Sequence, residues 1–183
     1  MTNIQIQPVV YVASGAAMDT LLGRPVKDVD FVVVGATVEW MLEHVGMPVG
    51  ADFPVFLHYV SNDEWALART ERKTGSGYHG FETDFNPSVT LEEDLFRRDL
   101  TINAMAVARD DWEEFQRTKN PDLVIDPFNG KQDLKDRILR HGSEAFADDP
   151  GRISRIARFS SRYDSTFACT IADETMELIK HKV

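Results

Sequence analysis

The sequence predicts an α+β fold, with a mixed-sheet domain over residues 1–140 and a short, partial helical domain over residues 141–183. Strand and helix patterns alternate in the first part of the chain, whereas helical patterns dominate after residue 149. A length of 183 residues with 43% hydrophobic residues suits one compact domain with a small appendage.

The first half of the chain alternates between short strands and short helices. Apolar, β-branched runs predict the strands, and Thr37 and Gly46 are the expected N-cap and stop of the second helix. The expected elements are a strand at 8–14, a helix at 15–23, a strand at 28–36, a helix at 37–46, and a hairpin of strands at 53–60 and 64–70.

The second half is expected to be mainly helical. Residues 90–108 are predicted to form one long helix, with Thr90 and Glu93 as a capping box. A short strand and turn at 124–130 precedes a helix at 131–141. Three glycines between residues 73 and 81 indicate a mobile loop.

Composition excludes several classes of function. The net charge of −10 argues against binding nucleic acid through overall charge, although arginines cluster locally. The single cysteine, Cys169, excludes an internal disulfide framework, and the five histidines show no zinc-site spacing. Without an apolar run of membrane-spanning length or a leader pattern, the expected location is cytoplasmic, with no membrane partner.

Asp28 and Asp30 stand one residue apart in a run that otherwise has the pattern of a buried strand. On a strand, residues i and i+2 point to the same face, so the two carboxylates are expected to project together. Such a pair repels unless a cation lies between its members, and Mg²⁺ prefers oxygen ligands and bridges to phosphates. The pair predicts a metal site, the alternative being two solvated aspartates at a strand end.

Gly15 lies between the first expected strand and the first helix. A glycine at a helix N-terminus lets backbone N–H groups approach a phosphate. A glycine, a helix and then paired aspartates on the next strand indicate nucleotide transfer. The alternative is a simple turn glycine, with Ser14 as an ordinary N-cap.

Seven blocks of sequence, in one order, resemble the bacterial CCA-adding enzymes, the class II tRNA nucleotidyltransferases of the polymerase-β-like superfamily. The resemblance is nearly collinear from Tyr11 to the C-terminus, with a small insertion near residues 111–121. The blocks are "LLGRPVKDVDFVVVGAT", "VGADFPVFLH", "ALARTERKTGSGYHGF", "VTLEEDLFRRDLTINAMA", "IDPFNGKQDLKDRILRH", "AFADDPGRISRIARF" and "IADET".

This resemblance implies a nucleotidyltransferase head over residues 1–140 and a partial neck that recognises the nucleobase over residues 141–183. The family adds C, C and A to the 3′ end of tRNA from CTP and ATP, with Mg²⁺. Asp28 and Asp30 would be catalytic metal ligands, and Glu71 a third catalytic carboxylate, unless it only forms a surface salt bridge.

The resemblance also implies a set of nucleotide-binding residues. Gly15 and the position of Met18 would line the triphosphate site, and Arg98 would contact the nucleotide with Asp99 and Asn103 in support, although Arg98 and Asp99 also suit a charged helix face. The segment "DDPGRISRIAR" resembles the family's base-reading motif. There Asp149 and Arg152 would bond the base edge, and Arg155 and Arg158 would face the triphosphate.

Residue spacing agrees in part with these roles. At 100° per residue, Arg152, Arg155, Arg158 and Arg162 share one arc of a helix, with Ile153, Ile156 and Ala157 opposite. Asp149 before Pro150 is also a good helix N-cap. The loop at 74–80 would correspond to the family's flexible loop, the alternative being a disordered surface loop.

Three departures from the family pattern bear on function. Met18 replaces an arginine expected near the triphosphate, and a thioether does not pair with phosphate. Asp148 replaces a glutamate, and the chain ends at Val183, where family members continue into tRNA-gripping helices. The alternatives are therefore another RNA nucleotidyltransferase, such as a poly(A) polymerase, or a weak remnant that binds nucleotide, RNA or a partner subunit. A homo-oligomer also remains open.

Overall fold

The computed structural model describes residues 7–50, 55–73, 81–143, 146, 150–162 and 169–182. Its centre is a seven-stranded mixed sheet in the order β3-β4-β5-β2-β1-β8-β9. Only β2 and β5 run parallel, and the other neighbours are antiparallel. The strands are β1 Val9–Ala13, β2 Asp30–Val34, β3 Gly46–Val49, β4 Val55–His58, β5 Glu64–Leu67, β8 Ala106–Ala108 and β9 Val124–Ile125.

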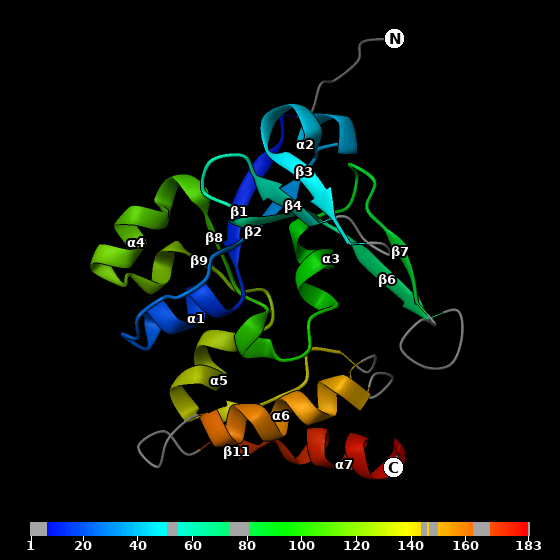
Figure 1. The fold of residues 1–183 in the computed structure, drawn as a ribbon. Coiled ribbons are helices and arrows are strands. Elements are labelled where there is room, and N and C mark those ends of the chain that lie inside the picture. Colours follow the sequence, from blue (N-terminus) through cyan, green and yellow to red (C-terminus); the bar gives the residue numbers. More distant parts are fainter. Residues whose placement is uncertain are drawn as a thin grey trace.

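Helices cover both faces of this sheet, and further helices gather at one end of the molecule (Figure 1). Two small sheets complete the fold: β6 Thr70–Lys73 with β7 Phe81–Asp84, and β10 Ile138–Leu139 with β11 Thr170–Ile171. The helices are α1 Gly15–Leu21, α2 Val38–His44, α3 Leu91–Phe96, α4 Trp112–Thr118, α5 Gly130–Asp136, α6 Pro150–Arg162 and α7 Asp173–Lys182.

Side chains on the two faces of β2 belong to two different apolar clusters of the core. Val33 packs with Met41 of α2, whereas Val32 packs with Leu95 of α3 on the opposite face. The third cluster contains residues of α1, α4, α5 and α6, among them Met18 and Ile156. The site-bearing ends of β1, β2 and α3 are thus held by packing on both sides of the sheet.

Most of the elements expected in the first half of the chain are confirmed. The Thr37 side chain caps α2 by accepting from the Trp40 N–H group at 3.2 Å, and β4 and β5 form the expected hairpin. The capping box of Thr90 and Glu93 is also present at the start of α3. The glycine-containing loop at 74–80 lies outside the described residues.

The prediction of one long helix over residues 90–108 is wrong. Helix α3 ends at Phe96, a 3₁₀ turn covers Thr101–Asn103, and Ala106–Ala108 forms strand β8. The carboxylate of Asp99 accepts the Leu100 N–H group at 2.9 Å, which replaces a helical bond. Pairing of β8 with β1 and β9 then overrides the helix propensity of an alanine-rich run.

Two further differences follow from pairing between distant segments. The helix predicted at 131–141 ends at Asp136, because β10 pairs with β11, a strand that the sequence pattern did not reveal. The region near residues 111–121, expected only as an insertion, contains α4. Within the described residues, the structure has no helix long and apolar enough to cross a membrane.

Close backbone packing at the start of α5 makes Gly130 sensitive to substitution. A Cβ atom there would lie 2.2 Å from the carbonyl oxygen of Thr101. We expect Gly130→Ala to lower the free energy of unfolding by about 1–3 kcal/mol in urea titrations, because the backbone must shift. Gly15→Ala is the control, since its Cβ meets nothing within 4 Å. Equal stability of the two variants would contradict the packing.

Candidate active site

The acidic pair lies where the chain enters β2. Asp30 is the first residue of β2 and pairs with Ala13 of β1, whereas Asp28 lies before the strand, and both residues are exposed. The expectation that both aspartates sit within a buried strand is therefore wrong. Exposure lowers the cost of holding two carboxylates close together, because water solvates them.

Three effects shift the pKa of the Asp30 carboxyl. Desolvation by the surrounding protein raises the pKa of the Asp30 carboxyl, the Arg98 guanidinium lowers it, and negative Asp28 raises it, with a net rise. Ionised Asp28 and Asp30 thus repel each other. Among the described residues, no group of three or more His, Cys, Asp or Glu side chains could hold a metal ion.

A strained turn precedes α1 and joins it to the chain after α3. Ser14 has φ 60° and ψ −128°, a conformation that costs a residue with a Cβ atom. Its N–H group donates to the Met105 carbonyl at 3.1 Å, and its hydroxyl donates to the Asn103 carbonyl at 3.2 Å and accepts from Arg98. Gly15 follows, and the space beside its Cα atom is open.

The structure brings Arg98, Asp99, Asn103 and Arg155 together next to this turn. The Asn103 amide donates to Asp99 Oδ1 at 3.0 Å, and Arg155 Nη1 lies 3.4 Å from Asp99 Oδ2. Arg155 belongs to α6, so Asp99 connects the segment after α3 with that helix. The turn before α1, the segment after α3 and helix α6 therefore meet in one region of the molecule.

Glu71 forms the salt bridge that the sequence analysis gave as the alternative to a metal ligand, but with a side chain that is only 18% exposed. Its Oε1 atom lies 3.2 Å from both Arg69 Nε and Arg97 Nη1, and its Oε2 atom lies 3.2 Å from Arg152 Nη2. The structure does not bring Glu71 into a metal-holding group with Asp28 and Asp30. Its carboxylate binds three guanidinium groups instead.

Asp94, which the sequence analysis did not single out, is fully buried. Its carboxylate lies 2.7 Å from Arg97 Nη2 and 2.8 Å from Arg98 Nη2, and it accepts the Arg69 N–H group at 3.1 Å. Burial raises the pKa of Asp94, but Arg98 and Arg97 together lower it by more than burial raises it, so the net shift is downward. The signal available in the sequence was the position of Asp94 three and four residues before Arg97 and Arg98, a spacing that allows ion pairs on a helix.

Two predicted nucleotide-binding residues lie deeper than expected. Met18 is 4% exposed in the apolar cluster beneath α1, and Arg152 is 7% exposed. Arg152 and Ile156 are four residues apart on α6, so their side chains point in directions only about 40° apart around the helix axis. Arg152 therefore faces inward with buried Ile156, whereas Ala157 is exposed. Asp149 and the side chain of Arg158 lie outside the described part of the chain.

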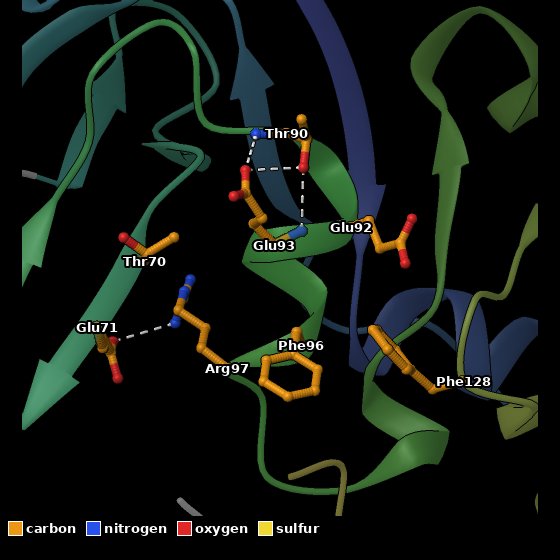
Figure 2. A pocket seen from close by; sticks show the side chains of 8 residues that line it. All are labelled: Thr70, Glu71, Thr90, Glu92, Glu93, Phe96, Arg97 and Phe128. Atoms are coloured by element: carbon orange, nitrogen blue, oxygen red, sulfur yellow. Dashed lines mark hydrogen bonds and ion pairs between the residues drawn. The ribbon is translucent and has the colours of Figure 1, made fainter.

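A groove of about 670 Å³ has Glu71 and Arg97 in its wall. Figure 2 shows its walls: Glu71 and Arg97 on one side, and the rings of Phe96 and Phe128 on the other, with the centroids 5.6 Å apart. Phe96 is 52% exposed. The lining residues are Thr70, Glu71, Thr90, Glu92, Glu93, Phe96, Arg97 and Phe128.

The mixed sheet and the acidic pair beside a glycine turn define the class of protein. The chain matches the family described as "Poly A polymerase head domain" over residues 10–140, and it belongs to that family. It is 56% identical over 170 residues to the "Multifunctional CCA protein" of Hahella chejuensis (strain KCTC 2396), covering 93% of this chain and 37% of that protein. With the "CCA-adding enzyme" of Pseudomonas putida (strain W619) it shares 56% identity over 171 residues, covering 93% and 43%.

Solved structures resemble the fold over nearly the whole chain. A Bacillus stearothermophilus CCA-adding enzyme in complex with CTP has a TM-score of 0.66 at 29% identity, covering 96% of this chain and 39% of that one. The Thermotoga maritima CCA-adding enzyme complexed with tRNA_CCA has a TM-score of 0.64 at 31% identity, covering 96% and 38%. This chain thus spans about two fifths of the length of these relatives.

Removing the charge of Asp94 should destabilise the protein in a pH-dependent way. We expect Asp94→Asn to cost about 3 kcal/mol near pH 7 in urea unfolding, because Arg97 and Arg98 lose a buried partner. Since the folded-state pKa of Asp94 is lowered, this contribution is present above its unfolded-state pKa and is lost as the pH falls through the folded value.

The control for this prediction is Asp84→Asn, at an exposed position on β7. Its stability should stay within about 0.5 kcal/mol of the parent protein. A difference between parent and Asp94→Asn that stays constant from pH 7 down to acid unfolding would contradict the lowered pKa.

Proposed function

We propose that this chain is the catalytic head and the beginning of the neck of a CCA-adding tRNA nucleotidyltransferase. The reaction would transfer CMP and AMP from CTP and ATP to the 3′-hydroxyl of tRNA. The observation that carries the proposal is the acidic pair of Asp28 and Asp30, with Arg98 close enough to influence Asp30 and in contact with Ser14 before Gly15. The similarity to CCA-adding enzymes over 93% of the chain supports it.

The proposed division into domains follows residues 1–140 for the head and 141–183 for a partial neck. The family match ends at residue 140, which supports this boundary. Helix α6 carries Arg152 and Arg155, the proposed contacts to the base and to the triphosphate. The ion pairs Arg152–Glu71 and Arg155–Asp99 connect the two parts.

The donor set of Asp28 and Asp30 fits Mg²⁺. Two exposed carboxylates that repel each other match the preference of this ion for few protein oxygens, water and substrate phosphates. When bound, Mg²⁺ would lower the pKa of the RNA 3′-hydroxyl and offset the negative charge of the departing pyrophosphate. Glu71 is not assigned to this role, because it binds three arginines.

The other site residues would bind and orient the triphosphate. Arg98 is held by Asp94 and the Ser14 hydroxyl, so its guanidinium is fixed before substrate arrives. Arg155 would add positive charge from α6, with Arg158 as a further proposed contact on the same helix. Asp99 and Asn103 brace each other beneath these arginines.

Open space at Gly15 would let a phosphate approach the backbone at the start of α1. Met18 offers no cation there, so charge stabilisation would depend on Arg98 and Arg155. Asp149 and Arg152 are proposed to read the base edge.

A second candidate function is poly(A) addition, which the description of the matching family favours. Nucleotide preference separates the two, because CCA addition needs CTP as well as ATP. A remnant that binds nucleotide, RNA or a partner subunit without turnover is the third possibility.

Primer extension tests the proposal directly. The chain is incubated with MgCl₂, labelled CTP and ATP, and tRNA lacking its terminal CCA. We expect addition of C and A, and we expect Asp28→Asn and Asp30→Asn to reduce it to background, since each variant loses one carboxylate. The control is Asp63→Asn, a substitution at the turn of the hairpin between β4 and β5.

Other results would assign the other functions. Extension by ATP alone would favour poly(A) addition. Binding of CTP and ATP without extension would favour a remnant, and the absence of both binding and extension would contradict the nucleotidyltransferase proposal.

A further inference from the structure

Glu71 connects β6 to α6 through Arg152. Arg152 Nη2 lies 3.2 Å from Glu71 Oε2, although the two residues are 81 positions apart in the sequence. The side chains of Arg152 and Glu71 are 9% and 18% exposed. A charged pair this far from solvent interacts strongly and has few alternative geometries.

The two oxygens of Glu71 make different contacts. Oε1 accepts from Arg69, just before β6, and from Arg97, just after α3, whereas Oε2 accepts from Arg152. The two arginines at Oε1 fix the carboxylate plane. That plane then sets the direction from which the Arg152 guanidinium approaches, because guanidinium and carboxylate prefer a planar arrangement.

We propose that Glu71 is a positioning residue that orients Arg152 and thereby sets the preference for C and A over U and G. The inference rests on the proposed function, in which Arg152 faces the incoming base. It gives Glu71 a role in selecting the nucleotide and not in holding the metal.

The chemistry of the base edges explains why orientation matters. On the pairing edge, cytosine and adenine each present a ring nitrogen that accepts a hydrogen bond, whereas uracil and guanine present a ring N–H donor there. A guanidinium has only donors, so it can pair with the first two and faces a donor in the others. A site built for one pattern rejects the other because buried polar groups are left unpaired, and a rotated guanidinium loses this discrimination.

A purely structural role for Glu71 predicts a different result. If the carboxylate only neutralised three arginines, its loss would lower stability and weaken all nucleotides alike. The ratio of affinities for CTP and UTP separates the two roles, because a ratio measured on one preparation does not change with its folded fraction.

The test measures binding of CTP, ATP, UTP and GTP to the full chain with MgCl₂ by isothermal titration calorimetry. We expect the parent protein to prefer CTP and ATP, and Glu71→Gln to reduce the CTP-to-UTP ratio about tenfold, equivalent to 1.4 kcal/mol. In an Arg152→Ala background, Glu71→Gln should change the ratio no further, because the residue through which it acts is absent.

Glu64→Gln is the matched control, since it makes the same substitution at an exposed glutamate on β5. It should keep the parent CTP-to-UTP ratio. If the parent protein prefers CTP over UTP and Glu71→Gln keeps the same ratio, the inference about Glu71 is overturned and the proposed function stands. A parent that binds none of the four nucleotides, or binds all four equally, would overturn the proposed function, and the inference with it.

Discussion

A single buried charge, the carboxylate of Asp94, constrains the arrangement of the site. A carboxylate removed from water must be paired and hydrogen-bonded, and Asp94 meets this requirement with Arg97, Arg98 and the backbone of Arg69. Each partner then reaches another element. Arg98 contacts Ser14 in the turn before α1, and Arg97 contacts Glu71 on β6.

The contacts on the two sides of Asp94 have different proposed roles. On one side, Arg98 lies near Asp30 and the glycine turn, where the proposed reaction would take place. On the other side, Glu71 gathers three arginines and reaches α6 through Arg152. Figure 1 shows α6 at the end of the molecule beyond α3, so the network spans the boundary between the proposed head and neck. The proposed nucleotide transfer and the proposed base selection would then both depend on the buried carboxylate of Asp94.

The sequence predicted those parts of the fold that depend on local signals. The capping box at Thr90 and the N-cap at Thr37 were confirmed, because short-range hydrogen bonds decide them. The length of α3 was not predictable in this way, since strand β8 forms by pairing with β1, about 95 residues earlier. Strand β11 was missed for the same reason.

For the site, residue spacing singled out the acidic pair, and the resemblance to CCA-adding enzymes singled out Arg98, Asp99 and Asn103, a segment that the structure places beside the turn at Ser14. A salt bridge of Glu71 to a neighbouring arginine was foreseen, but its pairing with Arg152 was not predictable, because Arg152 approaches from a helix 81 residues away. Asp94 was missed because one acid among three in the first turn of α3 carries no sign of its burial. For Glu71 the deciding contact joins segments far apart in the sequence, whereas for Asp94 the local spacing to Arg97 and Arg98 was present and only the burial was hidden.

In a crystal structure of the chain with CTP and MnCl₂, the anomalous signal of Mn²⁺ would locate the metal. We expect a metal peak between Asp28 and Asp30, the triphosphate beside Arg98, and cytosine beside Arg152 with the Glu71 contact intact. A metal bound at Glu71, or CTP bound away from the acidic pair, would contradict the proposed site.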